Sequence, residues 1–235
     1  MTQLQEHPIA YAYSSRLWAL MPNVCKVISE LSSHDREFFG EVGTILKLAG
    51  QTHRFAITLL HSHFDIGENE FLADEITNVI LTSVYRQDSA SALAQLVPKS
   101  WKFQESSGTA FETEWQALTY IQRKDLDHEP LGSSDAPLMR NLAAAFRHFD
   151  VTERFGMAHP GPRAAEGKIW TEGEEITDRY LLQEQLALDE VEARNPMTTM
   201  WAFDEEGKQI VVLGCCLRSR DGSGHTGSVH PPGRY

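Results

Sequence analysis

An internal repeat is the feature that most limits how this chain can fold. When the sequence is shifted by 100 residues against itself, residues 31–105 fall on residues 131–205 without gaps and share 14 identical positions. The matches cluster in short motifs, which are T-x-R-F at 52–55 and 152–155 and W-x-F at 101–103 and 201–203. Such self-similarity indicates supersecondary units that pack on each other. We expect two modules, residues 31–123 and 131–220, packed as one domain.

Both copies predict the same order of elements. Apolar residues recur at i, i+1, i+4 and i+8 over 35–49 and 135–149, behind a Ser and an Asp that can cap a helix. Strands that begin with Arg-Phe, contain Glu-Ile-Thr and contain Trp-x-Phe should follow, the last of them forming a hairpin at a glycine. The predicted fold class is α+β, with two pseudo-symmetric modules of one helix and antiparallel strands.

Other segments add to this plan. Residues 1–30 are expected to form an additional N-terminal helical segment, with a helix over 14–31 that Pro22 can break. A further helix is predicted around 177–193, and the tail 221–235 is expected to be disordered. The helix around 177–193 is predicted from an apolar stripe of four leucines, Leu181, Leu182, Leu186 and Leu188. A groove shared by the two modules, across an approximate two-fold axis, is the expected place for a ligand.

The charge balance narrows the classes of partner. The chain has 33 acidic and 21 basic residues, a net charge of −12. This excess of negative charge disfavours nucleic acid and anionic membrane surfaces, which are bound through Lys and Arg. The apolar run 210–217 is too short to span a bilayer. Three cysteines, two of them adjacent, make a poor disulfide framework, and no signal peptide is visible, so we expect a cytoplasmic, reduced protein.

Two histidines are the main candidates for chemistry. His61 and His63 follow an apolar run, and because side chains alternate along a strand they point to the same side. That spacing can offer two nitrogens to one divalent metal ion, Zn, Fe, Ni or Mn. Glu68 or Glu70 is a candidate third ligand or general base, and His159 is a candidate ligand from the other module. The alternative is that both histidines close a buried strand through ordinary hydrogen bonds.

The repeat informs this choice. Module two carries Gly161 and Arg163 where module one carries His61 and His63, so the fold does not require the histidines. Arg54 and Arg154 recur together with a Glu at 75 and 175. They are interpreted as strand-bridging ion pairs, with binding of a carboxylate or phosphate in the groove as the alternative. The acidic residues between 172 and 192, Glu172 included, are interpreted as a solvated face.

One short pattern resembles a family. The stretch R-F-A-I-T-L-L-H-S-H-F at 54–64 resembles the pattern R-F-x(4)-L-H-x-H-F of uncharacterised proteins from filamentous fungi, and R-F-G-M-A-H at 154–159 is a partial second copy. The resemblance implies no activity and transfers no functional residue. It implies only a leaning towards fungal small-molecule (secondary) metabolism.

Two functions remain open at this level. The first is an intracellular protein that binds a small molecule or a partner in the groove, without catalysis. The second is a metal-dependent enzyme on a small organic substrate, with the pair His61 and His63 as ligands. The absence of any complete catalytic motif favours the first.

Overall fold

The fold is a closed barrel with helices packed outside it. The computed structural model describes residues 15–23, 26–27, 30–86, 95–105, 113–175, 179–192 and 196–217. The strands are β1 (Ala56–Leu59), β2 (Glu70–Ile76), β3 (Ile80–Arg86), β4 (Leu96–Glu105), β5 (Thr113–Gln122), β6 (Phe155–Ala158), β7 (Lys168–Glu175), β8 (Tyr180–Ala187), β9 (Pro196–Phe203) and β10 (Gln209–Leu217). The α-helices are α1 (Ser15–Leu20), α2 (Ser33–Leu48), α4 (Ala136–His148) and α5 (Leu188–Glu192).

The strands follow one another around the barrel as β1-β6-β4-β5-β2-β3-β8-β7-β10-β9, and pairing of β9 with β1 closes it. Most neighbours are antiparallel, but β2 pairs with β5, and β7 with β10, in parallel. The α+β class is therefore confirmed, whereas the expectation of purely antiparallel strands is wrong. Parallel neighbours cannot be joined by a tight hairpin, so local turn signals did not reveal them.

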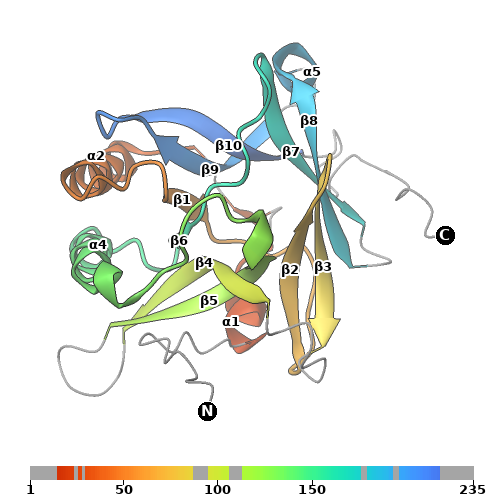
Figure 1. The fold of residues 1–235 in the computed structure, drawn as a ribbon, viewed down its shortest axis with the longest axis horizontal. Helices are drawn as coiled ribbons and strands as arrows, with labels where there is room; N and C mark the ends of the chain where they lie inside the picture. The colour runs from red at the N-terminus through yellow and green to blue at the C-terminus, as the bar shows by residue number, and fades with distance from the viewer. Residues whose placement is uncertain are drawn as a thin grey trace.

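The helices α2 and α4 lie side by side on one side of the barrel (Figure 1). Both were predicted by their apolar spacing, and both bury that face against strands β1, β4, β6 and β9. Ser32 caps α2: its hydroxyl accepts from the backbone of Asp35, whose carboxylate accepts from the backbone of Ser32. Aromatic contacts cross between the halves, as where Phe38 meets Phe146 edge-on with ring centroids 4.9 Å apart.

The two arginines of the repeated Arg-Phe motif hold helix starts. The Nη1 and Nη2 atoms of Arg54 donate to the carboxylate of Asp135, at 2.9 and 3.1 Å, and Arg154 pairs with Asp35 at 2.9 Å. Each arginine thus reaches the helix of the other half. The structural interpretation of these arginines agrees with this arrangement, but the carboxylates that pair with them in the described structure, Asp135 and Asp35, lie at helix starts and not on adjacent strands.

The order of elements after α2 is the same as that after α4: one short strand and then two pairs of strands. The internal repeat in sequence stays a prediction, and one part of its alignment is out of register. In the ladders, Asp74 lies opposite Thr82 and beside Ile121, while Glu172 lies opposite Gln183 and beside Cys216. The ladder pairs Glu75 with Leu81 but Glu175 with Tyr180, so a constant offset of 100 residues does not align the two hairpins.

One helix prediction is confirmed in part and another is wrong. The helix α1 ends at Leu20, before Pro22, and the chain then runs on to an isolated bridge between Asn23 and Ser62. The stretch predicted as a helix around 177–193 is mainly strand β8, with only the short α5 at its end. Leu181 and Leu182 point to opposite faces of β8 and both are buried, and two consecutive buried residues also fit a helix. The tail 221–235 lies outside the described residues.

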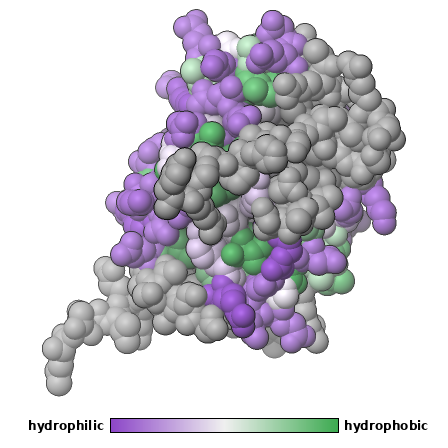
Figure 2. Space-filling model, turned by 90° about the vertical axis from the view of Figure 1, so that its right-hand side faces the viewer, coloured by the Kyte–Doolittle hydropathy of each residue, from purple (hydrophilic) through white to green (hydrophobic). Residues whose placement is uncertain are grey.

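Surface character agrees with the acidic composition. The coloured residues of the face in Figure 2 are mainly hydrophilic, with hydrophobic side chains in small separate patches. Among the helices that the structure describes, none has the length and apolar character needed to cross a membrane.

Candidate metal centre

A cavity of about 110 Å³ lies inside the barrel, next to α1. It is lined from both halves of the chain, by side chains of β1 to β5 and of β6 to β9. The indole N–H of Trp18 in α1 donates to the Phe64 carbonyl at 2.7 Å and holds the helix against this end of the barrel. Most of the wall is apolar, from leucines at 60, 72, 118 and 181, so the polar groups inside it are conspicuous.

His61 and His63 reach this cavity from the segment that follows β1. The Nδ1 of His61 lies 2.8 Å from the carbonyl oxygen of Leu59. A carbonyl only accepts hydrogen bonds, so Nδ1 carries the hydrogen and Nε2 keeps its lone pair. That lone pair points to the Nε2 of His63, 3.0 Å away. A backbone carbonyl that fixes the tautomer in this way is the usual companion of a metal-bound histidine.

Glu172 of β7 completes the group. Its Oε2 lies 3.4 Å from His63 Nε2 and 3.9 Å from His61 Nε2, and the three side chains are 13%, 1% and 9% exposed. Bonds of 2.0–2.1 Å to a tetrahedral metal separate neighbouring ligands by about 3.3 Å. The distances observed here surround that value. The three residues form a group that can hold a metal ion.

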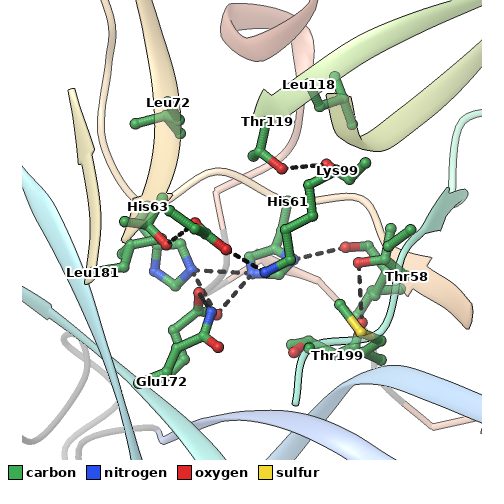
Figure 3. A pocket seen from close by; sticks show the side chains of 18 of the residues that line it. Thr58, His61, His63, Leu72, Lys99, Leu118, Thr119, Glu172, Leu181 and Thr199 are labelled. Carbon is green, nitrogen blue, oxygen red and sulfur yellow. Dashed lines mark hydrogen bonds and ion pairs between the residues drawn. The ribbon is translucent and has the colours of Figure 1, made fainter. Parts of the chain in front are cut away.

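The electrostatics favour a cation at this point. Burial alone would raise the pKa of the Glu172 carboxyl, but its favourable interactions with His63 and His61 outweigh burial and hold the pKa well below its usual value. The carboxylate is therefore ionised at neutral pH. Gln183 of the neighbouring strand donates to its other oxygen at 3.4 Å and restricts its rotation. The Nε2 atoms of both histidines and a carboxylate oxygen of Glu172 converge in a wall that is mainly apolar (Figure 3).

An ion pair lies beside this group. The ammonium of Lys99 in β4 contacts Asp74 Oδ2, and the Thr82 hydroxyl donates to Asp74 Oδ1 at 2.6 Å. All three residues are buried. The ladder of β4 with β5 shifts register on both sides of Ser100, so neighbouring residues Lys99 and Ser100 both line the cavity. Figure 3 shows Lys99 extending towards His61.

The structure separates the residues that the sequence singled out. His61 and His63 come together as predicted. Glu68 is exposed, and Glu70 binds the guanidinium of Arg179 at 2.7 and 2.9 Å, so neither glutamate lines the cavity. Arg54 and Arg154 also lie outside it, in the ion pairs described above.

His159, the predicted third ligand, belongs to a different cluster. It is fully buried between Phe55 and Trp101, and its Nδ1 lies 2.9 Å from the Arg54 carbonyl and 2.7 Å from His128. It does not meet His61 and His63 in the group that can hold a metal.

Glu172 and Lys99 were missed. Glu172 was read with its acidic neighbours as a solvated face, although alternation in β7 places it on the same side as the buried Trp170. That alternation was the available signal. No local signal marks Lys99, because the irregular register of β4 determines where it points.

The chain matches no protein-family model, no curated protein and no solved structure. The chemistry of this centre therefore rests on its own residues.

Proposed function

We propose that this protein is a metal-dependent enzyme acting on a small organic molecule in the barrel cavity, with one divalent ion held by His61, His63 and Glu172. The observation that supports this most strongly is the convergence of three ligand atoms within 3.0–3.9 Å, with His61 fixed in the metal-binding tautomer by Leu59. Of the two functions that the sequence left open, the second is thereby preferred, in a cavity lined by both halves.

Two histidines and one carboxylate are a donor set shared by catalytic zinc sites and non-haem iron sites. Three protein ligands leave positions on the metal for water or substrate. A metal held in this way polarises a carbonyl oxygen or lowers the pKa of a bound water. The protein's own part is to orient the ligands through Leu59 and Gln183 and to surround the substrate with walls that are mainly apolar.

Metal content tests the proposal. Protein purified without an affinity tag should carry about one zinc, iron, nickel or manganese ion per chain, or bind one on titration, measured by elemental mass spectrometry. The double variant His61→Ala/His63→Ala should lose this metal while its circular dichroism stays that of the wild type. A matched control is His53→Ala/His148→Ala, which removes two exposed histidines.

A separate control distinguishes the loss of a metal ligand from the loss of a negative charge in the cavity. Glu172→Gln removes a ligand and a negative charge, whereas Asp74→Asn removes the same charge from the same cavity without removing a ligand. We expect Glu172→Gln to weaken metal binding by about tenfold to a hundredfold more than Asp74→Asn, in competition with a chelator. If the wild type binds none of the four metals stoichiometrically, or if the control loses as much metal as the histidine variant, the proposal is wrong.

A further inference from the structure

A second buried carboxylate faces the same cavity as the metal-binding group. Asp74 lies in the first strand of the hairpin β2-β3, opposite Thr82, and Glu172 lies in the first strand of the hairpin β7-β8, opposite Gln183. The surroundings of the two differ. Glu172 meets two histidines, whereas Asp74 meets the ammonium of Lys99. The cavity therefore has a metal-binding side and a side with a buried ion pair.

Lys99 has hydrogen-bonding capacity to spare. An ammonium carries three N–H donors, and Asp74 is the hydrogen-bond partner that the described residues provide for it. The nearby hydroxyls of Ser100 and Thr119 are bonded to each other at 2.7 Å. With its side chain 7% exposed, Lys99 needs an acceptor from the cavity for its remaining donors, because buried donors without partners are costly.

The charges of the cavity point to the kind of acceptor. A divalent metal, two neutral imidazoles, the carboxylates of Glu172 and Asp74 and the ammonium of Lys99 together leave one positive charge in excess. In an apolar enclosure such an excess attracts a ligand of opposite charge more strongly than it would in water. A neutral ligand would leave the charge of the loaded cavity uncompensated.

We propose that the metal-loaded cavity selects a small monoanionic molecule, a carboxylate or an enolate on a mainly hydrocarbon body, with Lys99 as the residue that donates to the anionic oxygen. This inference rests on the proposed metal centre and names its substrate class. The hydrocarbon body suits the apolar walls supplied by Leu72, Leu118 and Leu181. The anion bound at the metal removes the excess charge, and Lys99 gains the acceptor that it needs.

The test compares two probes of one shape, isobutyrate and its neutral amide, isobutyramide. Zinc binding is first measured by calorimetry, and each probe is then titrated into the zinc-loaded protein. The wild type should bind isobutyrate about tenfold or more tightly than the amide, the ratio that one hydrogen bond to a charged group supports. In the metal-free protein this preference should disappear.

Two variants assign the preference to Lys99. Lys99→Met should lose most of the affinity for isobutyrate and keep that for the amide. The control Lys102→Met removes a second buried lysine of β4, which pairs with Glu153 outside the cavity, and should behave as the wild type. Asp74→Asn removes a competing negative charge and should strengthen binding of isobutyrate, so the proposal is tested even if Lys99→Met does not fold.

The outcomes separate the two proposals. Failure of zinc and the other metals to bind would overturn the metal centre and the anion site together. Zinc binding with equal affinities for acid and amide, with no detectable binding of isobutyrate, or with an unchanged preference in Lys99→Met and Asp74→Asn, would overturn the anion site alone.

Discussion

At the scale of single residues, the histidine cluster away from the cavity is a source of acid sensitivity. His159 is fully buried, and its Nε2 finds no hydrogen-bond partner among the described residues. Burial lowers the pKa of His159 to about 3, and burial together with the charge of Arg54 lowers the pKa of His128 to about 4. Both imidazoles are therefore neutral in the folded protein throughout the physiological range.

The lowered pKa of His159 makes the folded protein less stable in acid. An unfolded histidine binds a proton below pH 6.5, whereas His159 stays neutral until about pH 3. Unfolding thus takes up protons, and stability falls as the pH falls below 6.5. At pH 4.5 His159 should account for about 2–3 kcal/mol of lost stability. In urea denaturation His159→Leu should lose less stability between pH 7 and pH 4.5 than the wild type.

The exposed His148 supplies the control for this measurement, since His148→Leu should keep the pH dependence of the wild type. A His159→Leu protein whose stability declined in parallel with that of the wild type would contradict the assignment.

Two of the three proposed metal ligands, His61 and His63, could be singled out from the sequence alone. The spacing of His61 and His63 was visible in the sequence, although the strand that suggested it, β1, ends at Leu59 and both histidines lie in the segment that follows. Glu172 is more than 100 positions away along the chain, and only the pairing of distant strands brings it to the histidines. Lys99 depends on an irregular ladder, which no periodicity reports.

At the scale of elements, the backbone of α2 lies very close to the turn after β9. A Cβ added at Gly43 would lie 1.8 Å from the carbonyl oxygen of Gly207, and Gly207 itself has a φ of +77° that favours glycine. Gly40 lies in the same helix, yet a Cβ there would meet nothing within 4 Å.

Two alanine substitutions in α2 should consequently act in opposite directions. Gly43→Ala must push the helix from the turn and should lower the free energy of unfolding by about 2–3 kcal/mol. Gly40→Ala should raise it by about 0.5–1 kcal/mol, because alanine favours a helix. Chemical denaturation measures both. Equal effects of the two substitutions would mean that α2 does not approach the turn this closely in solution.

Sequence periodicity predicted the two long helices correctly but not the strand β8. The predicted helices of 35–49 and 135–149 are present as α2 and α4 because their apolar stripes, and the Ser32 cap of α2, are local features; Asp135 makes no side-chain cap in α4. The stretch around β8 was misread because consecutive leucines such as Leu181 and Leu182 suit a buried strand and a helix equally. This stretch forms a strand because it pairs with β7 in a hairpin and with β3, which is about 100 residues away in the sequence.

At the scale of the whole molecule, the halves are interleaved. The neighbours of β1 are β6 and β9, both from the second half, and the neighbours of β6 are β1 and β4, both from the first. The helix α2 packs its aromatic side chains on Phe146, Phe155 and Trp201 of the second half. Each half thus lacks part of its sheet and part of its core when alone.

Cutting the chain tests this interdependence. Fragments 1–126 and 127–235, divided between β5 and α4, should each show no cooperative unfolding transition when isolated. An equimolar mixture should regain the circular dichroism and the thermal transition of the intact protein. A single fragment that unfolded cooperatively would show that the strand exchange is not needed for stability.

The exchange of β1 and β6 has a consequence during protein synthesis. When β1 leaves the ribosome, both strands that flank it in the barrel are still untranslated, and about 100 residues remain before β6 appears. At about 5–20 residues per second, the N-terminal half waits about 5–20 s with unpaired strand edges. Such edges pair with whatever strand arrives first. On a polysome, that strand can come from a neighbouring nascent chain of the same protein, and the two chains then form a domain-swapped dimer.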